Sequence, residues 1–259
     1  MNPPPAAYTI ATSGLAVERQ ESTKLVTFTR PDVGNCLSAG MAAELQQIVE
    51  DSHTDGTQLL ILQAQGKHFC TGFDLSDLDQ ESDDTLLARF TRIELLLQLL
   101  RHAPFPTAAM AQGAIVGAGA DLFAACDHRI AAPTAFLSFP GAGFGLVLGS
   151  AHLARLVGTD AARQWINSGA RINAQEALES GLATGVADAS EFSALSVTLA
   201  EHAHRLDPVT RIAIRQATDL GAAQANADLA ALIRSAARPG LKQRILDYRA
   251  KQQQARKGS

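Results

Sequence analysis

Two glycine-rich stretches carry backbone groups that could act on a carbonyl compound. The first covers residues 66–75 (GKHFCTGFDL), and the second covers 113–122 (GAIVGAGADL). Each follows a predicted strand and the second opens a predicted helix, so backbone N–H groups are left unpaired and face a ligand. Two such amides that converge on one carbonyl oxygen would form an oxyanion hole.

Side chains beside these stretches add one candidate for proton transfer. Asp121 lies in the first turn of the helix predicted after the second stretch, where it either moves a proton or complements the helix dipole. The three cysteines, Cys36, Cys70 and Cys126, have no C-x-x-C spacing. This spacing predicts neither a disulfide framework nor a metal site and fits a reducing compartment.

Composition and charge indicate a globular chain that binds neither nucleic acid nor membrane. The 259 residues are 46% hydrophobic, which is ample for a packed core. The formal net charge of -4 argues against a nucleic-acid partner. We find no secretory signal and no apolar stretch that could span a bilayer, so we expect a cytoplasmic protein.

The elements that must position these groups alternate between strands and helices. Short β-rich or apolar runs predict strands at 24–30, 58–63, 107–111, 128–132 and 135–139. Helical spacing predicts helices over roughly 39–54 (with Ser38 as N-cap), 86–100 and 118–126. This alternation implies βαβ units, a mainly parallel sheet and right-handed crossovers.

The two ends of the chain are expected to differ from this core. Residues 1–14 are rich in Pro and Ala, and we expect them to be loosely ordered. From about residue 149 onward the spacing predicts only helices, with breaks near Asp207-Pro208 and Pro239-Gly240. The tail carries no strand signal and should pack as a helical appendage.

Further motifs accompany the glycine stretches in a fixed order. They are Arg30-Pro31, 35–38 (NCLS), 123–132, Phe139-Pro140, Gly145-Leu146, 155–158 (RLVG) and 174–182 (AQEALESGL). Together these motifs resemble the crotonase superfamily, also called the enoyl-CoA hydratase/isomerase family. The resemblance covers roughly residues 15–190, and its specificity comes from the linked series, because either glycine stretch alone would be a weak signal.

The resemblance implies an α/β fold with a spiral ββα core built on two roughly perpendicular sheets. It also implies a helical C-terminal region that mediates trimerisation. We therefore expect the core over residues 1–195, the helical region over 196–259, and a homotrimer or a hexamer that is a dimer of trimers. The implied substrate is an acyl-CoA thioester of fatty acid metabolism, with coenzyme A as part of the substrate and no permanently bound cofactor.

By motif position, the resemblance assigns the oxyanion hole to the backbone N–H groups of Phe73 and Ala118. These donors would polarise the thioester carbonyl and stabilise an enolate, and removing one donor of this kind typically costs about 2.7–4 kcal/mol of barrier. The same match predicts substrate-binding roles for Asn35, Cys36, Thr71, Gly72, Asp74, Leu75, Gly117 and Gly141.

The carboxylate positions are where this chain departs from the family. Hydratases of the family resemble one another in using two glutamates, and the first position here is Asp121, which is one methylene shorter. The second falls at Gly141, and a further acid of dienoyl-CoA isomerases falls at Gly149. Some naphthoyl-CoA synthases resemble the chain at the second position, since they carry glycine there and recruit bicarbonate as the base.

Three explanations remain open at this point. Asp121 acts alone with water or a substrate group completing the proton path, an anion occupies the space over Gly141, or the site binds an acyl-CoA and barely turns it over. We expect 2-enoyl-CoA hydration as the reaction. An isomerase and anion-assisted C–C bond chemistry are the other reactions, and a non-catalytic acyl-CoA-binding or scaffold protein is the alternative of a different class.

Overall fold

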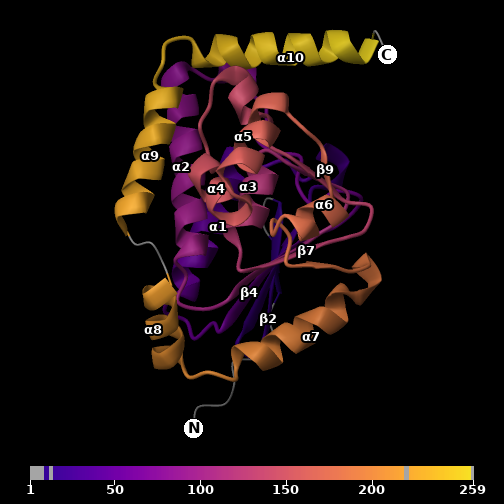
Figure 1. Ribbon diagram of the computed structural model, residues 1–259, viewed down its shortest axis with the longest axis vertical. Coiled ribbons are helices and arrows are strands. Elements are labelled where there is room, and N and C mark those ends of the chain that lie inside the picture. The colour runs from indigo at the N-terminus through magenta and orange to yellow at the C-terminus, as the bar shows by residue number, and fades with distance from the viewer. Residues whose placement is uncertain (1–8, 12–13, 219–221, 258–259) are drawn as a thin grey trace.

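The computed structural model describes residues 9–11, 14–218 and 222–257 (Figure 1). Within these residues, one sheet has the strand order β1-β2-β3-β4-β5-β7-β10, and a smaller sheet has the order β6-β8-β9. The strands are β1 (Thr9–Ala11), β2 (Leu15–Gln20), β3 (Thr23–Phe28), β4 (Leu59–Ala64), β5 (Thr107–Ala111), β6 (Ala114–Val116), β7 (His128–Ala131), β8 (Phe136–Ser138), β9 (Ile172–Asn173) and β10 (Gly185–Val186).

Helices connect and cover these strands. They are α1 (Ala39–Ser52), α2 (Asp83–Arg101), α3 (Ala118–Ala125), α4 (Ser150–Val157), α5 (Thr159–Ser168), α6 (Ala174–Glu179), α7 (Phe192–Ala203), α8 (Pro208–Thr218), α9 (Ala222–Ala236) and α10 (Leu241–Lys257). Short 3₁₀ turns are η1 (Pro31–Val33), η2 (Leu78–Gln80), η3 (Pro140–Phe144) and η4 (Ala189–Glu191). The predicted N-cap of α1 is confirmed, because the Ser38 side chain accepts a hydrogen bond from the Met41 N–H at 3.2 Å.

The large sheet is mainly parallel, as predicted. The pairs β3–β4, β4–β5, β5–β7 and β7–β10 are parallel, whereas β1–β2 and β2–β3 are antiparallel. All of β5 and the first four residues of β4 are buried. Continuous burial of this kind is typical of parallel strands that are covered on both faces.

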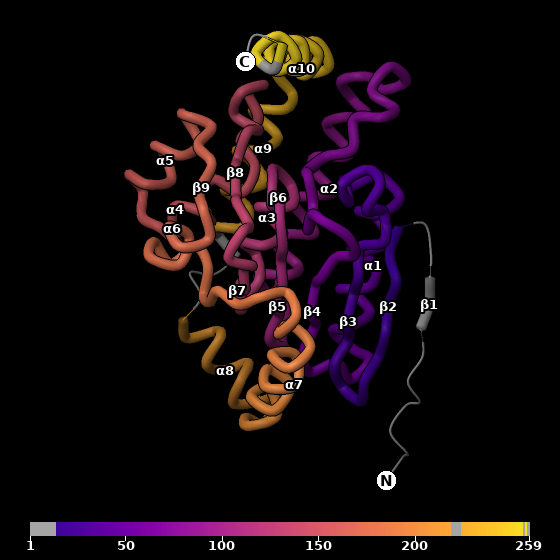
Figure 2. Tube along the Cα trace, turned by 90° about the vertical axis from the view of Figure 1, so that its right-hand side faces the viewer, coloured from indigo at the N-terminus to yellow at the C-terminus, as the bar shows by residue number. Residues whose placement is uncertain are grey.

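Helices α1 and α7 cover opposite faces of this sheet. Lys24 on β3 donates from Nζ to the Ser52 hydroxyl of α1 at 2.8 Å. Its neighbours Thr23 and Leu25 point the other way, into a groove that α7 borders. In Figure 2 the strands from β2 to β5 lie side by side, and α7 lies at their lower end.

The C-terminal helices pack on the core without adding a strand in the described part of the tail. Helix α9 runs beside α2 (Figure 1), and the Gln98 amide of α2 donates to the Ala225 carbonyl of α9 at 2.9 Å. Breaks follow α7 and α9 at the predicted places, and α7 itself runs across the expected boundary at residue 195. None of the helices in the described ranges has both the length and the apolarity needed to cross a bilayer.

Two expectations for the chain ends are wrong. Within the segment 1–14, residues 9–11 form β1 and pair with β2, which we did not predict, and residues 1–8 and 12–13 lie outside the described residues. Strand β2 was not predicted either. Its residues alternate between buried and exposed, which is typical of a strand, but the polar residues in its second half (Glu18, Arg19, Gln20) hide this alternation in the sequence.

The region after residue 149 is not purely helical, because it contains β9 and β10. Each has two residues and is too short to show any period in the sequence. Their partners, β8 and β7, come from earlier in the chain, so tertiary pairing determines these strands.

Candidate active site

The two glycine-rich stretches lie against each other through backbone hydrogen bonds. Cys70 of the first stretch bridges to Ile115 on β6, with Cys70 N–H to Ala114 O at 3.3 Å and Val116 N–H to Cys70 O at 2.9 Å. On its other edge the same segment bonds to Leu37, whose N–H donates to Gly72 O at 2.7 Å. The first stretch is therefore held between residue 37 and β6, the strand within the second stretch.

Gly72 and Gly117 lie against each other where the two stretches meet. A Cβ atom on Gly117 would lie 3.6 Å from Gly72 Cα, and one on Gly72 would lie 3.1 Å from Val116 O. Both glycines adopt positive φ, 103° at Gly72 and 55° at Gly117, which other residues rarely do. Glycine at both positions thus lets the two main chains turn while in contact.

The residues that follow these glycines, Phe73 and Ala118, carry unused amides. Leu37 bonds to the flanking Gly72 O and to Asp74 N–H (3.0 Å), so the Phe73 N–H lies on the opposite edge, as in any parallel bridge. Ala118 is the first residue of α3, whose leading N–H groups have no acceptor within the helix. Within the described residues neither amide has a hydrogen-bond acceptor.

Asp121 lies one turn further along α3, and the residue is exposed by only 7%. In the part of the chain that the structure describes, this carboxyl group has no hydrogen-bond partner, although its backbone N–H donates to Gly117 O at 2.9 Å. Burial raises the pKa of Asp121 well above its ordinary value, and the charge of Glu94 raises it further, while Arg101 lowers it. The surroundings of Asp121 therefore favour its protonated form more than water does.

The two positions that lack an acid differ in the space around them. A Cβ on Gly141, in η3, would have Leu146 Cβ at 3.9 Å as its nearest neighbour, which is ordinary contact. A Cβ on Gly149 would lie 2.3 Å from Asp121 Oδ1, at a φ of 63°. Gly141 accordingly has room for a side chain, whereas the Asp121 carboxyl excludes one at Gly149.

Asn35 braces the loop that contacts the first glycine stretch. Its side chain has no exposed surface, its Oδ1 accepts from Arg30 N–H at 2.8 Å, and its Nδ2 donates to Gln65 O and His68 O. These bonds direct both polar atoms of the side chain into the loop, so only the Asn35 main chain remains for the predicted contact with substrate.

Asp74 is held by an ion pair with Arg30. The carboxylate Oδ2 accepts from Arg30 NH1 at 2.8 Å, and Oδ1 accepts from Ser76 N–H at 3.0 Å. Burial alone would raise the pKa of Asp74, but the Ser76 and Arg30 hydrogen bonds lower it to about 2. Burial and the neighbouring Asp74 raise the pKa of the Cys36 thiol to about 11, so this thiol stays protonated.

The remaining predicted contact residues lie in the same region but at different depths. Thr71 is exposed and packs on Gly34, where a Cβ would lie 2.7 Å from its side chain. Leu75 is partly buried against the core. Cys70 is buried, and burial raises the pKa of its thiol to about 12.

Arg89 and Phe90 on α2 contact the first stretch, although no sequence motif marks either residue. The Arg89 guanidinium lies 4.0 Å from the centroid of the Phe73 ring and donates from NH2 to Asp74 O at 3.2 Å. The Phe90 ring stacks on the same Phe73 ring, with the two centroids 4.5 Å apart. The two side chains thus fix the Phe73 ring and the carbonyl of the next residue.

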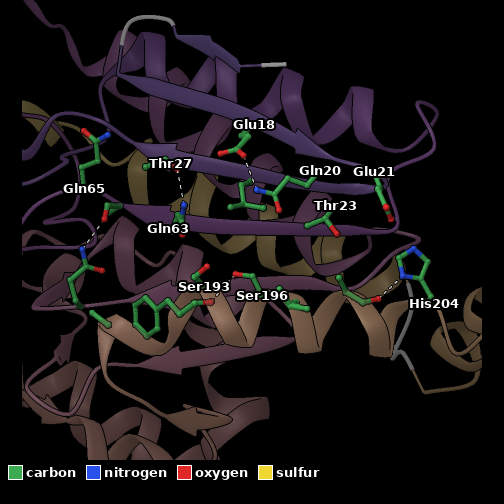
Figure 3. A pocket seen from close by; sticks show the side chains of 17 residues that line it. Glu18, Gln20, Glu21, Thr23, Thr27, Gln63, Gln65, Ser193, Ser196 and His204 are labelled. Atoms are coloured by element: carbon green, nitrogen blue, oxygen red, sulfur yellow. Dashed lines mark hydrogen bonds between the residues drawn. The ribbon is translucent and has the colours of Figure 1, made fainter. Parts of the chain in front are cut away.

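A separate polar groove of about 750 Å³ lies between the face of β2–β4 and α7 (Figure 3). Figure 3 shows Thr27 and Gln63 on the sheet side, where the Gln63 amide donates to the Thr27 hydroxyl at 3.0 Å, and Ser193 and Ser196 on α7 opposite. None of the predicted site residues lines this groove. Its size alone therefore does not connect it to the glycine stretches.

Known proteins resemble this chain over most of its length. The family model for enoyl-CoA hydratase/isomerase matches residues 18–256. A Bacillus subtilis protein named as an enoyl-CoA hydratase/isomerase, YngF, is 33% identical over 204 residues, which cover 77% of each chain. A Mycobacterium tuberculosis protein named as an enoyl-CoA hydratase, echA6, is 30% identical over 203 residues, or 74% of this chain and 81% of that one.

Solved structures agree with the fold. A Bordetella parapertussis protein described as an enoyl-CoA hydratase/isomerase superposes with a TM-score of 0.89 at 40% identity, covering 92% of this chain and 99% of that one. An enoyl-CoA hydratase of Bacillus anthracis superposes with a TM-score of 0.75 at 25% identity, covering 87% and 91%. The predicted core of two sheets with a helical C-terminal region is confirmed by these likenesses.

Proposed function

The chain belongs to the enoyl-CoA hydratase/isomerase family, and from that membership we propose that it binds an acyl-CoA thioester and stabilises its enolate with two amides. The donors are the N–H groups of Phe73 and Ala118. The observation that supports the proposal is the contact between Gly72 and Gly117, because the residues that follow these glycines have N–H groups without acceptors among the described residues. A thioester oxygen between them would receive two hydrogen bonds as negative charge develops on it.

Asp121 is the proposed proton-transfer group, and 2-enoyl-CoA hydration is the proposed reaction. Water adds to the β-carbon, and the electron pair of the C–C double bond moves to give the enolate. The protonated Asp121 carboxyl donates its proton to the α-carbon, and the proton lost by the added water returns to the carboxylate. One buried acid thus completes the cycle, and burial, which raises its pKa, favours the protonated form that donates.

A second candidate is a reaction in which an anion takes the place of the missing carboxylate. The open surroundings of Gly141 favour it, because the nearest atom to a Cβ there is 3.9 Å away. Such an anion would act as the base in isomerisation or in C–C bond chemistry. Bicarbonate dependence of turnover separates this candidate from hydration by Asp121 alone.

The activity test compares crotonyl-CoA hydration by the wild type with that of Asp121→Asn. We expect the wild type to hydrate the substrate and Asp121→Asn to lose about 10²–10⁴-fold in kcat, the usual contribution of general acid–base catalysis. Asp160→Asn, in the exposed first turn of α5, is the matched control and should keep full activity. Full activity of Asp121→Asn would refute the assigned role.

The same assay addresses the non-catalytic alternative. Tight binding of several acyl-CoAs without turnover of any of them would identify an acyl-CoA-binding or scaffold protein. The absence of carboxylates at Gly141 and Gly149 is the feature that favours this alternative.

We also propose a homotrimer, alone or doubled into a hexamer, in a reducing compartment such as the cytoplasm. Apolar side chains on α7 and α8 are exposed in the single chain, among them Val197 (59%), Val209 (78%) and Ile214 (49%). Cys36, Cys70 and Cys126 are all free thiols. Light scattering after size-exclusion chromatography should give three or six times the mass of one chain.

A further inference from the structure

His68, in the first glycine stretch, makes a side-chain hydrogen bond to the second stretch that the proposed reaction does not use. Its ring nitrogen Nδ1 accepts from the Ala114 N–H, with 3.0 Å between the two nitrogens. Ala114 is the first residue of β6 and is exposed by only 5%. A buried backbone N–H is costly to leave without an acceptor, so the ring is needed where β6 begins.

The His68 ring takes the place of a main-chain carbonyl. Cys70 N–H donates to Ala114 O, and Val116 N–H donates to Cys70 O, which is the pattern of a parallel bridge. In a regular parallel ladder, the next bond along this edge would join the Ala114 N–H to the His68 carbonyl. That carbonyl instead accepts from Asn35 Nδ2 at 2.7 Å, and the imidazole of the same residue becomes the acceptor for Ala114.

Gly113 provides the space that the ring needs. A Cβ atom on Gly113 would lie 2.8 Å from His68 Nδ1 and would overlap the Lys67 carbonyl oxygen, and the residue has a φ of 62°. Glycine is the residue that meets both conditions at once. The chain therefore contains the acceptor for the Ala114 N–H and the gap through which it reaches that N–H.

This hydrogen bond determines which form of the imidazole the fold accepts. Because an N–H donates to Nδ1, that nitrogen holds a lone pair, and the proton of the neutral ring lies on Nε2. A protonated His68 would place a second donor against the Ala114 N–H, with no lone pair between the two nitrogens. The bond therefore exists only while the ring is neutral.

The charges around the ring also favour its neutral form. Burial lowers the pKa of His68, and the positive charge of the adjacent Lys67 lowers it further. In the segment that carries Asn35, the Arg30 guanidinium is paired with Asp74 at 2.8 Å. Residues 112–118 on the other side carry no charge. In the part of the chain that the structure describes, no carboxylate therefore holds a proton on the ring.

We propose that His68 is a positioning residue whose neutral imidazole ties the first stretch to the start of β6 and so keeps the Phe73 and Ala118 amides aligned. The catalytic meaning of this inference rests on the proposed function. Each of the tied residues, His68 and Ala114, precedes one of these amides by a few positions. The tie is intact when the ring is neutral and is lost as pH falls through the pKa of His68.

The first test examines the tie without any substrate. Long-range ¹H–¹⁵N spectra should show that the Nδ1 atom of His68 is unprotonated near neutral pH, and the ring signals are assigned by their loss in His68→Leu. Removal of the acceptor in His68→Leu should lower the hydrogen-exchange protection factor of the Ala114 amide by about tenfold or more. Unchanged protection of Ala114 in folded His68→Leu, with folding verified by near-ultraviolet circular dichroism, would overturn the proposal.

His68→Asn separates the acceptor from the titrating ring. The side-chain oxygen of asparagine can accept where Nδ1 does, but it does not titrate. We expect His68→Asn to restore most of the Ala114 protection lost in His68→Leu and to keep it at acid pH, where the wild type loses it. Equal loss in both variants would show that ring packing holds β6, and wild-type protection that is independent of the His68 titration would exclude the pH-dependent tie. Either result would overturn the proposal.

The second test compares kcat for crotonyl-CoA hydration across pH. His68→Leu should lose about tenfold in kcat near neutral pH with little change in KM, because the amides become misaligned. The wild type should show an acid limb with the midpoint of the His68 titration, and His68→Asn should lack this limb. His202→Asn, which removes an exposed imidazole on α7, is the matched control and should follow the wild type.

Two outcomes of this assay distinguish the inference from the proposed function. An acid limb that stays at the same midpoint in His68→Asn would refute the catalytic part of the inference. Absence of turnover by the wild type would refute the proposed function instead, and the exchange of the Ala114 amide would still decide whether His68 ties the two stretches together.

Discussion

The two sides of the site are built on different principles. The amide side consists of main chain, where Gly72 and Gly117 meet and the next residues present N–H groups. The proposed proton-transfer side consists of side chains, and there Asp121 stands alone with glycine at both further acid positions. Backbone sterics constrain the first side closely, whereas the second side changes with a single substitution.

This difference explains why a chain can keep its family's substrate class while its reaction is open to change. An oxyanion hole serves any reaction that passes through a thioester enolate. The direction of proton transfer depends on which acids surround the substrate and on their pKa values. In this account the geometry of the glycines determines the type of intermediate that can be stabilised. Asp121 and its buried neighbours determine which proton transfer follows.

The largest effect should follow from disturbing the amide side. Gly117→Ala places a side chain at a φ of 55° and a ψ of -124°, a conformation open mainly to glycine, and should turn the Ala118 amide away. We expect kcat for crotonyl-CoA hydration to fall by about 10²–10³-fold, the usual loss for one oxyanion donor.

The control is Gly158→Ala, which also introduces a side chain at positive φ, 83°, but has no atom within 4 Å. It should lower the melting temperature and leave kcat near the wild-type value. Equal losses of kcat in both variants would show that backbone strain, and not the position of the amide, is responsible.

The next effect concerns the ion pair that braces the first stretch. The folded-state pKa of Asp74, about 2, lies below its ordinary value, so the ionised form stabilises the fold. That stabilisation, about 2 kcal/mol, is complete above the ordinary pKa and is lost as pH falls through about 2. Asp74→Asn should therefore lower the free energy of unfolding by about 2 kcal/mol at pH 7 and by little near pH 2.

Urea denaturation at several pH values measures this difference. Asp160→Asn, which removes an exposed carboxylate on α5, is a comparison for loss of charge alone. A cost for Asp74→Asn that does not decline with falling pH would contradict the assignment to the ion pair.

A smaller effect is expected from the contact between α2 and Phe73. Arg89→Leu removes the guanidinium from the Phe73 ring, from Asp74 O and from its ion pair with Glu81. The contacts with the Phe73 ring and Asp74 O together contribute about 1 kcal/mol. If they position the amide, kcat should drop by about fivefold with little change in KM. Arg163→Leu, on the exposed side of α5, should change neither, and a drop in both variants would point to a general effect of charge.

The smallest effect sharpens the contrast between the two glycines on the proton-transfer side. Gly141→Ala should change the free energy of unfolding by less than about 0.5 kcal/mol, because its Cβ meets only ordinary contacts. Gly149→Ala should be clearly destabilising, since its Cβ would overlap Asp121 Oδ1. Thermal melts of the two variants, measured side by side, test this difference. Equal destabilisation of both variants would contradict the described geometry.

Much of the core could be predicted because its signals are local. The buried strand 107–111 matches β5, and Ser38 caps α1 as expected. Strand β6 escaped prediction because its three residues lie between the glycines of the second stretch and show no period. Helix α2 begins earlier than predicted, at Asp83, because Ser82 and Thr85 form a capping box. The first residues of this helix are polar and show no apolar period, so the sequence did not indicate this start.

The candidate site was predictable only in the part that motifs encode. The family resemblance is confirmed, and the placement of Phe73, Ala118 and Asp121 follows from motif positions, although their roles remain predictions. Arg89 and Phe90 lie on a helix without a motif, and only the packing of α2 against the first stretch makes them relevant. Contacts between distant segments leave no local pattern, so a single sequence does not show them.

The most direct test of the account is a crystal structure with acetoacetyl-CoA bound, which reports the position of the thioester oxygen. The account predicts that this oxygen lies about 2.7–3.1 Å from both Phe73 N and Ala118 N, the range for oxyanion donors. A thioester oxygen that contacts neither amide, or a pantetheine arm bound away from the two glycine stretches, would contradict it.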